Sequence, residues 1–201
     1  VINNGGGFYS RQIYLDEVRR LGFPLLGPDV NKSGAGYLTE GQALRMGLSQ
    51  ILDLSSSVIG RIVEGRKQEG PFSGFNERIC PDKGSLRALI KSGALDECAS
   101  PLTRPAMFWS AAVHRPGKEL IEFDPVPQGL GDYSPGARLA DEKEFLGLLY
   151  SVHPLEVFRP RIESLTGLGP LSDSRNIRAK IGQKILIPGY VVTGKQVWTK
   201  D

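Results

Sequence analysis

The sequence contains few of the residues that mark secreted scaffolds, zinc modules or membrane proteins. Its 201 residues include two cysteines and two histidines. Two cysteines are too few for a disulfide framework, and no Cys/His cluster has the spacing of zinc ligands. No apolar run approaches the roughly 20 residues that cross a bilayer. These absences exclude the disulfide-stabilised and membrane-spanning classes, and they favour a reducing, cytoplasmic environment.

What the chain does contain is typical of a soluble globular protein, with 40% hydrophobic and 23% charged residues. A chain of this length buries roughly 70% of the surface that its unfolded form exposes, enough for one large domain or two small ones. The 25 glycines and 14 prolines predict many turns and short elements.

The formal net charge is +3, and its position is more informative than its size. Residues 61–91 hold seven basic and four acidic side chains, whereas residues 1–60 hold five of each and residues 92–201 thirteen of each. A local basic excess is typical of a surface that binds a polyanion. It is equally compatible with an ordinary solvated helix face.

The N-terminal part predicts one helix followed by extended chain. Ser10 is placed to cap a helix that ends at Gly22. After a proline turn, Asp29 and Asn31 are expected to bind the backbone of that turn through their side chains. The alternation of apolar residues from Leu44 onward predicts a strand.

Residues 48–97 predict two helical hairpins in tandem. The serines 55–57 are expected to cap a helix that Gly70 and Pro71 end, Ser73 to begin a short helical piece, and Asp82 to cap another amphipathic helix. Each hairpin is too small to bury its apolar stripe alone, so the two are expected to pack together.

The rest of the chain predicts fewer regular elements. Residues 101–180 are interpreted as a Pro/Gly-rich connector with one helix near 141–150, in whose first turn Asp141 and Glu142 would lie. A β-rich run from Lys184 to Val192 is followed by a possible return strand at 194–199. The fold class is therefore mainly α, with irregular connectors and short β segments.

The region from Leu48 to Arg66 has the apolar frame of a helix-hairpin-helix motif, whose turn presents backbone N–H groups to a DNA phosphate. Such a turn usually has two glycines, because backbone must approach phosphate closely and one residue needs a positive φ. Here Asp53 and Ser55 replace them. A purely structural hairpin is the alternative.

An ordered series of short motifs resembles the bacterial C-family DNA polymerases, the α subunit of DNA polymerase III. The series comprises Asn4–Ser10, Pro28–Ser33 (Pro-Asp-Val-Asn-x-Ser), Arg45–Leu48 with Ile51, Ile62–Glu64, Gly70–Phe72, Leu89–Asp96, Glu144–Gly147 and Ser151–Leu155. The motifs follow the family's order over nearly the whole chain, and that order is more specific than any one of them.

The resemblance implies a segment cut from a longer polymerase. It divides into 1–45 (end of the fingers), 46–100 (tandem helix-hairpin-helix), 101–180 (connector) and 181–201 (opening strands of a truncated oligonucleotide-binding barrel). In this family two Mg²⁺ ions are held by palm aspartates, which would lie upstream of Val1. The segment itself is therefore expected to hold no metal or cofactor and to have no catalytic residues. Its partners would be duplex DNA and the other domains of the polymerase, with the sliding clamp bound outside this segment.

Within that framework the segment is expected to hold the duplex by non-specific contacts with the phosphate backbone. The expected DNA contacts are Ser55, Ser56, Ser57, Arg61, Arg66, Lys67, Lys83, Ser85, Arg87 and Lys91. Three alternatives stay open: a scaffold between fingers and barrel that does not touch DNA, a diverged error-prone or accessory paralogue, and a helix-hairpin-helix repair enzyme, for which Asp96 is the only candidate catalytic group.

Overall fold

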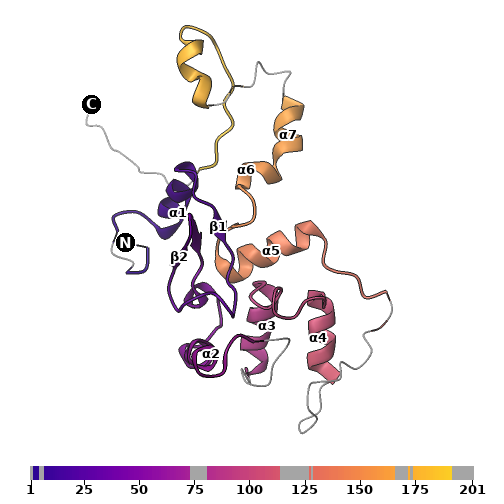
Figure 1. Ribbon diagram of the computed structural model, residues 1–201. Helices are drawn as coiled ribbons and strands as arrows, with labels where there is room; N and C mark the ends of the chain where they lie inside the picture. Colours follow the sequence, from indigo (N-terminus) through magenta and orange to yellow (C-terminus); the bar gives the residue numbers. More distant parts are fainter. Residues whose placement is uncertain are drawn as a thin grey trace, which may run out of the picture. The chain divides into compact units, whose positions relative to one another are not determined.

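The computed structural model (Figure 1) describes residues 2–4, 7–72, 81–113, 127, 129–165, 172 and 174–191. The chain forms two compact units, Val1–Ser151 and Val152–Asp201, and each is described by itself. The short helical piece expected from Ser73, most of the connector between α4 and α5, and the expected return strand at 194–199 lie outside the described residues.

The first unit is mainly helical with a small sheet. Its elements in chain order are α1 (Arg11–Arg20), β1 (Leu25–Leu26), β2 (Leu38–Glu40), β3 (Ala43–Arg45), the 3₁₀ turn η1 (Leu48–Gln50), α2 (Ser56–Glu69), α3 (Lys83–Lys91), α4 (Arg104–Val113) and α5 (Pro135–Leu146). The helix predicted after Ser10 is confirmed as α1, and Gly22 follows it with a φ of +87°.

The three strands pair in the order β1-β3-β2. β1 runs parallel to β3, with Leu25 opposite Leu44, and β2 runs antiparallel to β3, with Thr39 opposite Leu44. The strand predicted from Leu44 onward is present as β3, but it ends at Arg45, and Leu48 already belongs to the 3₁₀ turn η1. The sequence did not predict β2, because its three residues are all exposed and show no alternation.

The turn at residues 29–33 is fixed by its own side chains. Asp29 Oδ1 accepts hydrogen bonds from the backbone N–H of Asn31 (2.6 Å) and of Lys32 (3.2 Å). The Ser33 hydroxyl accepts from Asp29 N–H (2.9 Å) and donates to the carbonyl of Met46 (2.7 Å), just past β3. The predicted backbone-capping role of Asp29 is confirmed.

The same turn joins three more distant segments. Val30 N–H donates to the carbonyl of Ala94 (3.0 Å), after α3, and its own carbonyl accepts from Arg66 Nη1 (2.9 Å), on α2. The side chain of Asn31 donates to the carbonyl of Phe72 (2.9 Å) and accepts from Phe72 N–H (2.7 Å). The turn therefore ties the sheet to both helices of the hairpin region.

Gly47 allows two backbone segments to touch. The N–H groups of Leu48 and Ser49 donate to the carbonyls of Gly34 (2.9 Å) and Ala35 (3.0 Å). A Cβ atom at position 47 would lie 2.3 Å from the backbone carbonyl carbon of Gly36, far inside van der Waals contact. Here the motif glycine is required for space, since its φ of −77° is ordinary.

One hydrophobic core serves the helices of the first unit. Val58 and Ile62 from α2, Leu89 and Ile90 from α3, and Phe145 from α5 belong to the same buried cluster and are at most 1% exposed. The helices α2 and α3 therefore share one core, as expected, whereas the first helical piece of the second hairpin lies outside the described residues.

The prediction of an irregular connector was wrong at α4, and the helix predicted near residues 141–150 is present as α5 but starts at Pro135. Pro105 lies in the first turn of α4, where proline costs no hydrogen bond. Ser134 caps α5 by accepting from Ala137 N–H (3.2 Å), and Pro135 is its first residue. The high count of Pro and Gly concealed these two helix starts.

Because α5 begins earlier than predicted, Asp141 and Glu142 lie in the middle of the helix and not in its first turn. Both are buried, at 7% and 4% exposure. Glu142 Oε2 accepts from the N–H groups of Tyr150 (3.1 Å) and Ser151 (3.3 Å), so it fixes the chain after α5.

The second unit consists of short elements: α6 (Pro154–Val157), α7 (Arg159–Ser164) and the 3₁₀ helix η4 (Ser174–Lys180). His153 Nδ1 accepts from Leu155 N–H (3.2 Å) and caps α6, which is a structural role. In the described part of the expected barrel, an isolated bridge at Leu186 is present, whose carbonyl accepts from Ser172 N–H (2.9 Å). The barrel is not confirmed.

We predict that Gly47→Ala destabilises the protein by about 1–3 kcal/mol, because the added methyl group must displace backbone. Gly60→Ala is the matched control: Gly60 lies in α2 with open space around its Cβ position, so alanine there stabilises by about 0.5–1 kcal/mol. Urea unfolding of both variants measures the difference. Equal effects would contradict the steric role of Gly47.

We also predict that the effect of Asp29→Asn on stability, relative to the wild type, becomes more favourable as pH rises. Burial, with a further contribution from Glu97, raises the pKa of Asp29 above its usual value. The folded state therefore favours the protonated carboxyl, and this contribution to stability is lost as pH increases through the raised pKa. Asparagine retains the acceptor oxygen and does not ionise. The free energy of unfolding of the variant relative to the wild type should therefore be higher at pH 8 than at pH 4. The same relative free energy at both pH values would contradict the prediction.

Candidate nucleic-acid interface

The turn before α2 has the backbone of a glycine-type hairpin although its residues are not glycine. Asp53 has a φ of +63° and is the only non-glycine residue with a positive φ in the described parts of the chain. Leu54 is buried beneath it, and Leu52 N–H donates to the carbonyl of Phe145 (2.8 Å). The turn is therefore held by α5, and the first helix of this hairpin is reduced to the single turn η1.

The start of α2 is open to solvent. The Ser55 side chain accepts from Val58 N–H (3.3 Å), as the predicted cap requires, and both Ser56 and Ser57 are exposed. The N-terminal end of a helix carries unpaired N–H groups and a positive dipole, and both favour a phosphate. The exposed carboxylate-bearing residue Asp53 lies two positions before the cap and opposes this attraction.

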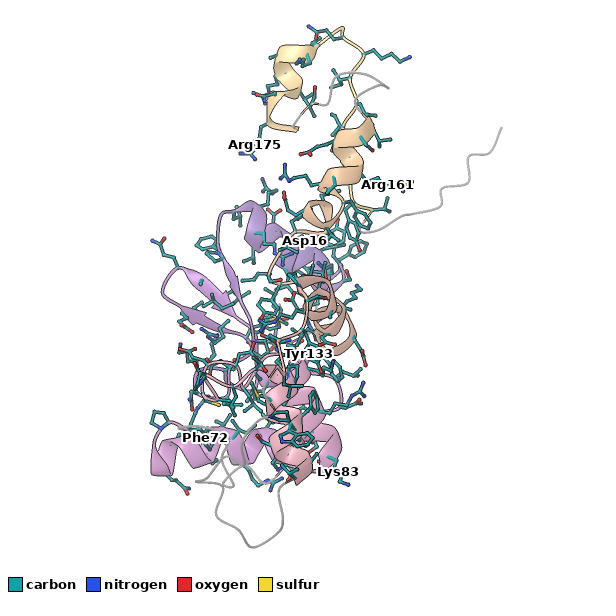
Figure 2. The ribbon with its side chains drawn as sticks, turned by 90° about the vertical axis from the view of Figure 1, so that its right-hand side faces the viewer. Asp16, Phe72, Lys83, Tyr133, Arg161 and Arg175 are labelled. Carbon is teal, nitrogen blue, oxygen red and sulfur yellow. The ribbon has the colours of Figure 1, made fainter. Side chains whose placement is uncertain are left out.

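The start of α3 is arranged differently. Asp82 caps it by accepting from Ser85 N–H (3.0 Å), and the Ser85 hydroxyl donates to the same carboxylate (2.7 Å). These hydrogen bonds lower the pKa of Asp82. Ser85 is 1% exposed, so its side chain has no surface to offer DNA, and we remove it from the expected contacts. Lys83, labelled in Figure 2, is exposed, and it forms no ion pair with any residue that the structure describes.

Arg66 serves the fold. Its guanidinium donates to the Val30 carbonyl, and burial lowers its pKa. Because this hydrogen bond holds α2 to the turn at residues 29–33, Arg66 is not available as a free surface cation.

Apart from Lys83, the other cations of α2 and α3 are also engaged by neighbours. Lys67 pairs with Glu64 (2.7 Å), and both are exposed. Arg87 pairs with Glu144 (3.1 Å) and lies 5.1 Å from the ring centroid of Phe145, on α5. Arg61 is exposed and likewise has an interaction partner. A phosphate at Lys67 or Arg87 would have to compete with a carboxylate.

Lys91 lies in a mixed acidic and aromatic environment. Its Nζ is 3.1 Å from Asp141 Oδ2 and 4.1 Å from the ring centroid of Tyr133, with Phe108 at 5.9 Å. Its side chain is 20% exposed. The residue therefore joins α3 to α4 and α5, and the sequence offered no signal for these long-range partners.

Asp96, the single candidate of the repair-enzyme hypothesis, is held by Arg104. Arg104 Nε and Nη2 donate to its two oxygens (3.0 and 2.8 Å), and Nη1 donates to the carbonyl of Lys91 (2.9 Å). Arg104 is 3% exposed, and its Nη2 lies 2.3 Å from where a Cβ of Gly93 would be. Asp96 is a structural partner in this arrangement.

The described parts of the chain offer neither a metal centre nor a membrane span. They contain no group of three or more His, Cys, Asp and Glu placed to hold a metal ion. No helix among them has the length and apolar character needed to cross a membrane.

The division into units changes where the positive charge lies. Val1–Ser151 contains 17 basic and 18 acidic residues, a balance of −1, and Val152–Asp201 contains eight basic and four acidic residues, a balance of +4. The excess in residues 61–91 is offset by nine acidic against five basic residues in 92–151. The excess of basic residues after position 151 is visible in the sequence, but it becomes apparent only when the residues are counted separately for each unit.

Comparison with known proteins matches residues 22–104 to the helix-hairpin-helix motif family. The turn at Asp53 and the capped start of α2 are the features expected of this class of protein. The chain is also 30% identical over 185 residues to the DNA polymerase III subunit alpha of Saccharopolyspora erythraea, and 30% identical over 203 residues to that of Thermus aquaticus. It is 28% identical over 200 residues to an error-prone DNA polymerase of Nocardia farcinica.

These three alignments cover 77%, 89% and 92% of the chain. Over the residues that align, the chain belongs to the bacterial DNA polymerase III α-subunit family. It spans 15% to 17% of the length of these relatives.

We predict that Asp53→Gly stabilises the protein by about 0.5–1 kcal/mol, since glycine adopts a positive φ without steric cost. Asp53→Asn should leave stability nearly unchanged, because asparagine also tolerates this conformation. Both variants remove the negative charge, so both should bind duplex DNA more tightly than the wild type. Unfolding and fluorescence anisotropy separate the two effects, and tighter binding by the glycine variant alone would contradict the electrostatic one.

Proposed function

We propose that this chain holds duplex DNA within a DNA polymerase III α subunit, through non-specific contacts between its first hairpin and the phosphate backbone. The observation that carries the proposal is the open N-terminal end of α2, with exposed Ser56 and Ser57, inside the helix-hairpin-helix match. Lys83, exposed at the start of α3, would add attraction to the phosphate backbone without reading the base sequence.

The proposal extends to the polymerase around this segment. Template-dependent DNA synthesis would be carried out by palm aspartates and two Mg²⁺ ions outside these residues, and the segment alone would be inactive. Residues 181–201 would begin an oligonucleotide-binding barrel. The partners would be the other domains of the same polymerase and, through regions elsewhere, the sliding clamp, all in the bacterial cytoplasm.

Two alternatives are kept. The error-prone relative aligns about as well as the replicative ones, at 28% against 30% identity, so a diverged paralogue is supported to the same degree. A scaffold that joins fingers to barrel without touching DNA is the second, and the pairing of Lys67 and Arg87 with carboxylates favours it.

The wild-type chain should bind a random-sequence duplex weakly at about 50 mM salt, with an affinity that falls steeply as salt increases and that does not depend on sequence. Fluorescence anisotropy of a labelled duplex measures this. Absence of binding under these conditions would favour the scaffold.

A matched pair of variants tests the site. Ser57 and Gly136 occupy the same position, second in the helix, in α2 and α5. A glutamate at either position suits the helix dipole and should not destabilise the fold. Ser57→Glu should weaken duplex binding about tenfold or more through repulsion of phosphate, whereas Gly136→Glu should not. Equal effects of the two substitutions would count against the first hairpin as the contact.

A further inference from the structure

We propose that the unit Val152–Asp201 carries a second, stronger contact with the backbone of duplex DNA, and that most of the salt-dependent affinity of the chain comes from it. The inference deepens the proposed function and rests on it. Its starting point is the charge balance, +4 for this unit against −1 for Val1–Ser151.

The acidic side chains described in this unit do not neutralise that charge, because both of them lie next to the same arginine, Arg159. Glu156 pairs with Arg159 through two hydrogen bonds (2.5 and 2.7 Å), and Glu163 lies 4.0 Å from the same guanidinium. No other Asp or Glu of the unit belongs to the described residues. Both carboxylates are thus occupied by a single cation.

Four further cations of the unit are left without an ion pair among the described residues. All lie on α7, on η4 or directly after η4: Arg161, Arg178, Lys180 and Lys184. This is the opposite of the first unit, where Lys67, Arg87 and Lys91 each face a carboxylate. Uncompensated positive charge on the described surface is therefore concentrated in the second unit.

Three of these four cations are close together along the chain. Arg178 and Lys180 belong to η4 and Lys184 follows it by four residues, so three positive charges lie within seven residues. Arg161 and Arg175 are both labelled on this unit in Figure 2. Like charges held close together repel, and a row of phosphates relieves the repulsion while releasing condensed counterions.

The chemistry favours nucleic acid over an anionic membrane as the partner. Arginine binds phosphate oxygens with a planar fork of donors, and two of the four unpaired cations, Arg161 and Arg178, are arginines. A helix that lies on a membrane inserts an apolar face into the lipid, and α7 and η4 offer only six and seven residues for such a face. Duplex DNA has the regular, dense phosphate array that a cluster of cations on short rigid elements can match.

The test uses the full chain with Arg178→Gln, Lys180→Gln and Lys184→Gln combined. The matched control is Arg20→Gln, Arg138→Gln and Lys143→Gln, which changes the net charge equally. The control cations lie in the first unit, and each is engaged locally, with Glu17, Asp132 and the Gly147 carbonyl respectively. Anisotropy with a random-sequence duplex is measured from about 50 to 200 mM salt, and circular dichroism checks folding.

The cluster variant should bind about tenfold or more weakly at about 50 mM salt, and the slope of log K against log salt should decrease by about 0.9 for each phosphate that is no longer neutralised. The control should keep the wild-type slope. Equal slopes for the two triple variants would overturn this inference. In that case the proposed function would still stand if the wild type binds the duplex and Ser57→Glu loses that binding. The reverse pattern, loss in the cluster variant alone, would overturn the first hairpin and support the second unit.

Two further arms separate other partners. A single-stranded oligonucleotide bound more tightly than the duplex through the same three residues would overturn the assignment to duplex. Vesicles of phosphatidylserine and phosphatidylcholine should not compete with the duplex, and competition that the cluster variant abolishes would identify a membrane surface instead.

Discussion

The hydrogen-bonded turn at residues 29–33 is the constraint on which the first unit depends. Its side chains fix its own backbone, and its backbone and side chains then reach β3, α2, the segment after α2 and the segment after α3. Four segments that are distant in sequence therefore meet at five consecutive residues. The start of α2, the proposed phosphate site, is positioned through this turn by Arg66 and through α5 by Leu52.

Several of the cations that were expected to contact DNA instead bind other parts of the protein. Arg66 holds α2 to the turn, Lys91 joins three helices, and Arg87 lies against α5. The remaining attraction at the first hairpin is that of a helix end, partly opposed by Asp53. A count of basic residues along the sequence therefore overestimates the positive charge that a polyanion meets, because several of these residues are paired with carboxylates in the folded protein.

Local features were predictable from the sequence, because their causes lie within a few residues. The caps at Ser55 and Asp82 and the turn at Asp29 follow from side chains that bind nearby backbone. The end of α1 follows from Gly22, which adopts a positive φ without steric cost. The aromatic neighbours of Lys91 and the burial of Ser85 could not be predicted, since they depend on how α4 and α5 pack against α3. The helix α4 was missed, and α5 was predicted to start too late, because each has a proline in its first turn that was interpreted as part of an irregular connector.

Gly93 and Arg104 show how such packing restricts change over evolutionary time. Position 93 has a φ of +81°, and the Arg104 guanidinium fills the space that a side chain there would occupy. Losing the glycine displaces the arginine, and losing the arginine leaves Asp96 and the Lys91 carbonyl without their donor. A side chain at position 93 would therefore meet two independent obstacles, the positive φ and the Arg104 guanidinium.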